Sequence, residues 1–296
     1  MARFRRTGAK QAVAGYLFVA PFMLVFVAML VLPLAYAAYL SLFQERLIGG
    51  STFVGLDNYT RAFTDSELLT GVWRVARFFV IQVPLMLILA LFFALVLDSG
   101  RLRSPRLFRL SFFVPYAIPS VVAALMWGYF YGKDFGPIGQ VATNLGFDAP
   151  NLLSGGAMLG SLSNIVTWEF TGYNMIILYA ALRSVPGDLY EAAAVDGAGA
   201  LRTAWSVKIP AIRPAILLTV IFSVIGSFQL FNEPKLLQQQ APNVITSSYT
   251  PNLDAYSLAF ISQEVNYAAA VSFLLGLVIV AASYGVLLVT NRRNAT

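Results

Sequence analysis

Long stretches without any charged residue constrain the fold of this chain more than any other feature. The segment from Gln11 to Gln44 contains no Asp, Glu, Lys or Arg, and runs of similar character recur along the sequence. A helix needs about 20 predominantly apolar residues to cross the hydrocarbon core of a bilayer. Only 11% of the 296 residues are charged, which is less than half of the share that is usual in soluble proteins. The sequence therefore predicts an all-α integral membrane protein.

Six segments come close to this length or exceed it, and we expect six transmembrane helices. They cover about residues 14–40, 78–97, 110–131, 158–182, 215–230 and 267–289. The first is longer than the apolar region of a signal peptide, about 7–15 residues, so we expect it to be retained. Pro115 and Pro119 interrupt the backbone hydrogen bonds of the third segment, which a membrane tolerates only against protein or water. No long polar segment separates the spans, so residues 1–296 are predicted to form a single transmembrane domain.

The distribution of positive charge predicts the orientation of the spans. Fourteen of the twenty Lys and Arg residues lie in the two terminal segments and in segments 101–109 and 183–213. Because Lys and Arg gather on cytoplasmic loops, both termini and these two segments are predicted to be cytoplasmic. Segment 45–76, with a short surface helix, and segment 231–264 would then face outward. The net charge of +6 follows from this distribution, and we expect no nucleic acid partner.

Missing residue types exclude several functions. The chain has no cysteine and no histidine, which rules out disulfides, thiolate nucleophiles, Ser-His-Asp chemistry and the usual zinc sites. It also lacks the GxxxxGK[ST] loop that cradles ATP phosphates. We therefore expect no catalytic residues, no metal and no cofactor in this chain. If ATP drives the protein, ATP and Mg²⁺ bind to a separate ATPase subunit.

The longest charge-bearing interruption on the predicted inner side runs from Ser184 to Pro214, SVPGDLYEAAAVDGAGALRTAWSVKIPAIRP. Its alanine-rich residues 189–195 predict a short helix, which the glycine at position 197 would end. Residues 201–207 predict a second short helix that would end at Pro210. On residue types alone, the segment is equally compatible with an ordinary cytoplasmic helical hairpin.

The order of residues in this segment closely resembles the cytoplasmic coupling loop, or EAA loop, of permease subunits in ATP-driven (ABC) importers. The flanking segments 53–63, 113–127 and 250–276 resemble the sugar-importing branch of that family, which includes the maltose permease pair. Trp205 and Ile209 depart from the residues that are common in the family but keep their apolar character. The matching residues of the loop are Glu191, Ala192, Ala193, Asp196, Gly197, Ala198, Val207 and Pro210.

The resemblance implies a type I ABC importer permease fold, with six transmembrane helices and both termini in the cytoplasm. In this family the loop docks as a coupling helix in a groove of the ATP-binding subunit. By this resemblance, the carboxylate of Glu191 helps to hold the coupling helix in that groove, and Gly197 forms the turn. The implied partners are a second, homologous permease subunit in a heterodimer, two ATP-binding subunits and an extracellular solute-binding protein. The implied solute is a di- or oligosaccharide, and the implied location is the cell membrane of a bacterium or archaeon.

Polar and aromatic residues within the predicted spans are candidates for the solute path, because sugars need hydrogen-bonding groups and aromatic faces. Tyr116 and Ser120 are one helical turn apart on the third span and would share a face. Thr167 and Ser223, like these two, match positions that contact sugar in the maltose system. Glu169 is the only ionisable residue within a predicted span. The candidates are Tyr116, Ser120, Thr167, Trp168, Glu169, Ser223, Ser227, Gln229 and Asn232.

Other interpretations of these residues stay open. Ser, Thr and Tyr within bundles also serve as interhelical hydrogen-bonding groups. Glu233 and the glutamines at 238–240 are expected to face outward, either near the docking surface of the solute-binding protein or in a solvated loop. The alternative function is that of a stand-alone secondary transporter or channel for a small polar solute. A single charged residue within the spans offers few groups for coupling transport to protons or sodium ions, however, and no internal repeat is evident.

Overall fold

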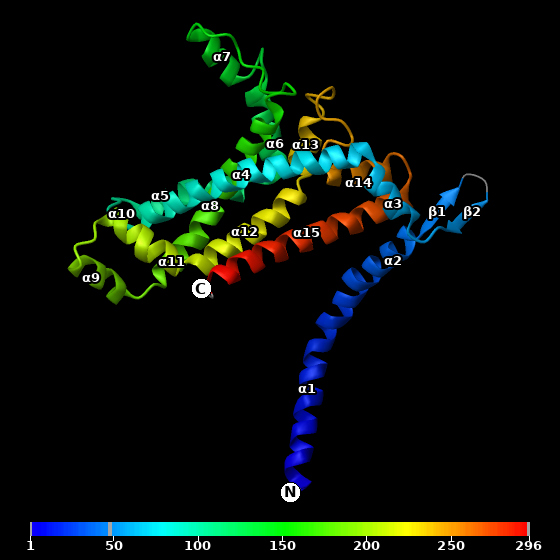
Figure 1. Cartoon of the computed structure of the whole chain (residues 1–296), viewed down its shortest axis with the longest axis horizontal. Helices are drawn as coiled ribbons and strands as arrows, with labels where there is room; N and C mark the ends of the chain where they lie inside the picture. The colour runs from blue at the N-terminus through cyan, green and yellow to red at the C-terminus, as the bar shows by residue number, and fades with distance from the viewer. Residues whose placement is uncertain (1, 47–48, 295–296) are drawn as a thin grey trace. The chain divides into compact units, whose positions relative to one another are not determined.

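The computed structural model describes the backbone of residues 2–46 and 49–294, and the side chains of residues 13–45 and 49–288. The remaining residues of the predicted domain 1–296 lie outside the described part of the chain. The Lys and Arg side chains of the two terminal segments, on which the predicted membrane orientation partly rests, lie outside it as well. The described chain divides into two compact units (Figure 1). One unit contains residues 1–64 and 258–274, and the other contains residues 65–257 and 275–296. Each unit is described by itself.

The first unit begins with a long helical segment. It consists of α1 (Ala2–Phe26), a π-helical turn η1 (Val27–Val31) and α2 (Leu32–Ser41), followed by strands β1 (Phe43–Arg46) and β2 (Gly50–Phe53) and helix α3 (Asp57–Thr64). The two strands pair antiparallel and place Phe43 opposite Phe53. The Asn58 side chain donates hydrogen bonds of 2.8 Å to the carbonyl oxygens of Ser41 and Phe43. These bonds fix α3 against the point where the long helix ends.

The second unit is a helical bundle. Its elements include α4 (Ser66–Asp98), α5 (Pro105–Ala117), α6 (Ser120–Tyr131), α7 (Pro137–Asn144), α8 (Met158–Arg183), α12 (Arg213–Phe228), α13 (Asn232–Leu237) and most of α14 (Pro251–Phe260). Helix α8 packs along both α4 and α5 (Figure 1). Phe78 and Ile165 belong to one buried apolar cluster, and Ala90 and Leu178 belong to another. The helix α15 (Val265–Asn294) begins in the first unit and ends in the second.

All six predicted spans coincide with helices. In the described part of the chain, the helical segments at Val13–Ser41, Ser66–Asp98, Arg213–Leu237 and Val265–Leu288 are long and apolar enough to cross a membrane. The pair α5 and α6 also passes this test as one broken span. Helix α8 has 26 residues and the length of a span, but its buried polar residues lower its hydropathy. The all-α membrane architecture is confirmed, with the short β-hairpin as an addition.

Two predicted outer segments are more ordered than the sequence suggests. Segment 45–76 was predicted to be a loop with one short helix, but α4 begins at Ser66, twelve residues before the predicted span. The carboxylate of Asp65 caps that helix by accepting hydrogen bonds from the amides of Glu67 (3.1 Å) and Leu68 (3.3 Å). Segment 231–264 contains the whole of α13 and α14.

The predicted shared face of Tyr116 and Ser120 is wrong. Helices α5 and α6 meet at an angle of 94°, so the two residues do not lie on successive turns of one helix. Ile118 adopts an extended conformation, with φ −79° and ψ 128°, because a residue before proline avoids the helical region. Pro119 then precedes the first residue of α6. The prediction of irregular backbone in this span is confirmed, but the bend separates the side chains.

Close packing between α5 and α8 depends on one glycine. A Cβ atom added to Gly172 would lie 1.7 Å from the carbonyl oxygen of Phe112. Such a distance is impossible for non-bonded atoms, so any larger residue has to displace the backbone of α5. Small residues serve this purpose in many membrane helix pairs, where they allow two backbones to approach.

We predict that Gly172→Ala lowers the stability of the purified protein by about 1–3 kcal/mol or more, because the α5 backbone must move. The matched control is Gly160→Ala on the same helix, where an added Cβ meets nothing within 4 Å. The control should be neutral or stabilise the helix by up to about 1 kcal/mol. Thermal unfolding in detergent measures both variants. Equal transition temperatures for the two would contradict the assigned packing.

Candidate functional site

Local backbone chemistry shapes the predicted coupling loop. Helix α9 (Gly187–Val195) ends at Gly197, which has φ +71°, a left-handed conformation that glycine adopts without steric cost. The amide of Ala198 donates to the Ala193 carbonyl oxygen (2.9 Å), and the amide of Gly197 donates to that of Ala194 (3.0 Å). This pair of bonds is a Schellman cap, which satisfies two carbonyl groups that the end of the helix would leave free.

The second half of the loop is longer than predicted. It consists of α10 (Ala200–Thr203), a π-helical turn η2 (Ala204–Lys208) and α11 (Ile209–Ala211). The prediction that this helix ends at Pro210 is therefore wrong by a small margin, since the break lies at Ile212. The π-helical turn comes directly before this proline, which has no N–H group to donate to the preceding turn.

The hairpin formed by residues 187–211 presents most of its predicted coupling residues to its surface. Glu191, Ala192, Asp196 and Gly197 are exposed, Ala198, Val207 and Pro210 are half-buried, and Ala193 is buried. Large apolar side chains are exposed beside them. Val195 is 88% exposed, Leu201 74% and Trp205 66%. A patch of exposed apolar residues mixed with acids is typical of a surface that binds another protein.

A largely buried ion pair ties this hairpin to the end of α4. The Nζ atom of Lys208 lies 2.5 Å from Oδ2 of Asp98, and the two side chains are only 16% and 6% exposed. The same ammonium group lies 5.1 Å from the ring centre of Tyr190, on α9. Burial, and then the neighbouring Asp98 carboxylate, raises the pKa of Tyr190 above its usual 10.0, while Arg183 opposes this shift. The phenol therefore stays neutral at physiological pH.

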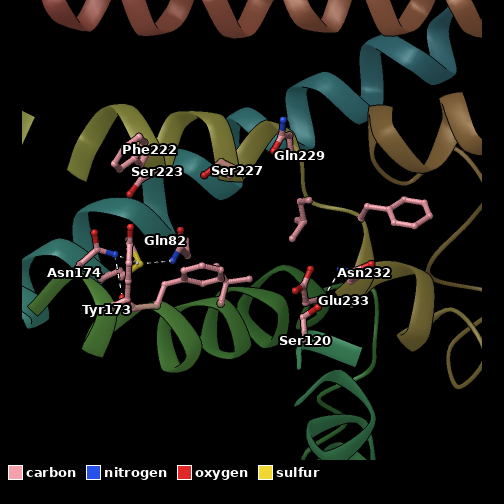
Figure 2. Close-up of a pocket in the computed structure, with 16 residues that line it drawn as sticks. Gln82, Ser120, Tyr173, Asn174, Phe222, Ser223, Ser227, Gln229, Asn232 and Glu233 are labelled. Atoms are coloured by element: carbon pink, nitrogen blue, oxygen red, sulfur yellow. Dashed lines mark hydrogen bonds between the residues drawn. The ribbon is translucent and has the colours of Figure 1, made fainter. Parts of the chain in front are cut away.

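A cavity of about 290 Å³ lies within the second unit, lined by residues from α4, α6, α8, α12 and α13 and from the connection between the last two helices (Figure 2). Its polar groups come from every one of these helices. Two hydrogen-bonding side chains bridge helices across its wall: the Asn232 amide donates to the Ser120 hydroxyl (2.9 Å), and the Asn174 amide contacts Met86. The polar and charged lining residues are Gln82, Ser120, Tyr173, Asn174, Ser223, Ser227, Gln229, Asn232 and Glu233.

Five of the nine predicted path residues line this cavity. They are Ser120, Ser223, Ser227, Gln229 and Asn232. The other four lie outside the lining. The ring of Tyr116 stacks on that of Tyr173, with ring centres 4.5 Å apart, and Trp168 packs edge-on against Trp127. Thr167 is buried and accepts a hydrogen bond of 3.4 Å from Gln82.

Several lining residues were not predicted from the sequence, and Glu233 is the most consequential of them. Predicted to face outward, it is instead 7% exposed and lines the cavity. Pro234 and the polar run after it suggested a loop, but residues 232–237 form the short helix α13. Asn174 and Gln82 could have been found, because both are uncharged polar residues within predicted spans. No group of three or more Asp or Glu residues in the described part of the chain could hold a metal ion.

Comparisons with known proteins agree with this arrangement. A family model described as "Binding-protein-dependent transport system inner membrane component" matches residues 78–293. The lactose transport system permease protein LacF of Rhizobium radiobacter is 30% identical over 283 residues, covering 92% of each protein. The arabinooligosaccharides transport system permease protein AraP of Bacillus subtilis (strain 168) is 29% identical over 279 residues, covering 91% of this chain and 86% of AraP.

A solved structure has the same fold. It is described as the crystal structure of a bacterial alginate ABC transporter in complex with alginate pentasaccharide-bound periplasmic protein. One of its chains matches with a TM-score of 0.86 and 17% sequence identity, covering 98% of both chains. The prediction of an importer permease fold is thereby confirmed. The relatives are permease proteins, in agreement with the prediction that the chain is a transport component and not an enzyme.

We predict that Asp98→Asn destabilises the protein by about 3 kcal/mol, because it leaves the Lys208 ammonium buried without a counter-charge. The matched control is Glu264→Gln, which removes the exposed ion pair with Arg61, whose side chains are 46% and 44% exposed. That change should cost less than about 1 kcal/mol. Chemical unfolding in detergent compares the two. A larger loss for Glu264→Gln would contradict the importance of the buried pair.

Proposed function

The chain belongs to the family of inner membrane components of binding-protein-dependent transport systems, and we propose that it is a permease subunit of an ATP-driven importer of di- or oligosaccharides. The observation that carries this proposal is the combination of a polar cavity within a bundle of membrane helices and an exposed hairpin at the end of the same helices. The relatives LacF and AraP are named for lactose and arabinooligosaccharide transport. The multi-pass membrane chain would form half of the path for the solute.

The cavity has the chemistry that a saccharide requires. Serine hydroxyl groups and amide groups of Gln and Asn offer both donors and acceptors to sugar hydroxyl groups. The rings of Tyr173, Phe170 and Phe222 supply apolar faces in the same lining. Ligand sites in proteins are mostly apolar with a few well-placed polar groups, and this cavity has both.

Two helices would carry motion from the hairpin to the cavity. Helix α12 begins directly after the hairpin and bears the lining residues Ser223 and Ser227. Helix α4 is held to the hairpin by the Asp98–Lys208 ion pair and bears Gln82 about 24 Å away, sixteen residues along the helix. A hairpin moved by a partner would shift both helices as rigid bodies, which is a common device for switching access.

The partners follow from this function. ATP and Mg²⁺ would bind to two separate ATP-binding subunits, one of which receives the hairpin with Glu191 and Asp196 at its surface. A second, homologous permease subunit would complete the path as a heterodimer, and an extracellular solute-binding protein would deliver the sugar. Both termini and the hairpin would lie in the cytoplasm of a bacterium or archaeon, with the chain in its inner membrane.

The first test is affinity purification of the tagged chain from native membranes in mild detergent, followed by identification of the proteins that co-purify. We expect an ATPase with a phosphate-binding loop and a second six-span permease in amounts comparable to the tagged chain. Recovery of the chain by itself would overturn the proposal and favour a stand-alone secondary transporter or channel.

We also predict that Gly197→Ala lowers solute uptake and solute-stimulated ATP hydrolysis of the purified complex, because alanine is strained at φ +71° by about 1 kcal/mol. Combining it with Glu191→Ala should abolish both activities. Gly199→Ala is the control, since Gly199 has φ −68° and an added Cβ meets nothing within 4 Å. Full solute uptake and full ATPase stimulation in the double variant would show that the hairpin does not couple ATP hydrolysis to transport.

A further inference from the structure

Glu233 gives the cavity wall an acidic group that no cation neutralises. The residue is 7% exposed and lies beside Ser120 in the lining (Figure 2). Among the described residues it forms no ion pair, and the lining contains no Lys or Arg. The nearest lysine along the chain, Lys235, is directed elsewhere: its ammonium group lies 3.5 Å from Oε1 of Gln238 and 5.0 Å from the ring centre of Tyr256.

A second acid stands behind the wall. Glu169 on α8 is 3% exposed, and its Oε2 atom has no hydrogen-bond partner. It lies on the same face of α8 as the lining residues Val166 and Tyr173, three residues after one and four before the other. Its carboxyl group is close enough to that of Glu233 for the two to interact electrostatically. A charge on a buried group is costly without a partner, and of the two acids only Glu233 lines the cavity, where a solute can donate hydrogen bonds to its carboxylate.

Two charged groups of α4, those of Arg74 and Asp98, are engaged away from the cavity. On α4, the guanidinium of Arg74 donates to the carbonyl oxygen of Tyr249 (2.6 Å) and lies 4.2 Å from the centre of its ring. At the far end of α4, Asp98 is paired with Lys208. The residues that α6 and α12 contribute to the lining are all uncharged.

We propose that Glu233 makes this cavity selective for solutes without negative charge, so that it accepts neutral or amino-bearing saccharides and excludes acidic ones. This inference rests on the proposed solute path and adds the charge class of the solute. A carboxylate on the wall accepts hydrogen bonds from hydroxyl or ammonium groups, and it repels a carboxylate, sulfate or phosphate group. Glu233 is therefore a specificity-determining residue.

The absence of cysteine makes a direct test possible. Ser223→Cys places the only thiol of the chain at the cavity, so modification of this chain reports that site even within the full complex. We would measure its reaction rates with a cationic and an anionic methanethiosulfonate reagent of similar size, reading the mass of this chain after each reaction. Gln140→Cys, at an exposed position of α7, supplies the reference ratio of the two rates.

We expect the cation-to-anion ratio at Ser223→Cys to exceed the reference by about tenfold, as one charge within a poorly solvated cavity produces. Adding Glu233→Gln should bring the ratio close to the reference, and Glu169→Gln should change it less. The ratio at Gln140→Cys should not respond to either change. Because labelling does not depend on transport, these results stand apart from the co-purification test of function.

Three results would overturn the inference. One is a ratio at Ser223→Cys equal to the reference. Another is a cation preference that persists in the Glu233→Gln variant although that protein keeps its normal thermal stability. The third is failure of both reagents to reach the thiol, because a cavity closed to them is closed to a sugar. If Glu233→Gln does not fold, Glu233→Ala serves as the second neutral variant: loss of the preference in it would sustain the inference, and an unchanged ratio would contradict it.

Discussion

A backbone amide or carbonyl group left without a partner in hydrocarbon costs several kcal/mol, and most of this structure follows from that constraint. The helices satisfy their own backbone groups, and two interruptions in the second unit lie at the wall of the cavity. One interruption lies at Ile118 and Pro119 and the other between α12 and α13. They meet through the hydrogen bond between Asn232 and Ser120 at the cavity wall. Both breaks in the helices thus form part of the cavity wall.

The parts that could be predicted from the sequence are those with local causes. Charge-free runs locate the helices because hydrocarbon excludes charge, and the glycine at 197 marks the end of α9 because few other residues adopt its backbone conformation. Polar residues on α12 pointed to the cavity for a similar reason. The parts that could not be predicted depend on tertiary contacts. The second span was predicted to begin at residue 78, after Arg77, yet α4 extends back to Ser66, and the guanidinium of Arg74 within this extension donates to the Tyr249 carbonyl oxygen.

The cavity shows the same division. A serine within a hydrophobic run is recognisable as a candidate, whereas the position of Tyr116 depends on a bend whose direction the sequence does not specify. Glu233 lies next to a proline and before a run of glutamines, a composition typical of a surface loop. The packing of α13 against α6 and α8 buries it. The roles of the hairpin and path residues in coupling and transport stay predictions, which the experiments above address.

The burial of the Asp98–Lys208 pair has a consequence for the conditions under which the protein works. Dissolved salt screens exposed charges over about 8–10 Å but reaches buried ones poorly. The half-exposed pair of Arg61 and Glu264 therefore weakens as ionic strength rises, while the pair that holds the hairpin does not. The connection between the hairpin and α4 therefore depends less on ionic strength than the contact between Arg61 and Glu264 does.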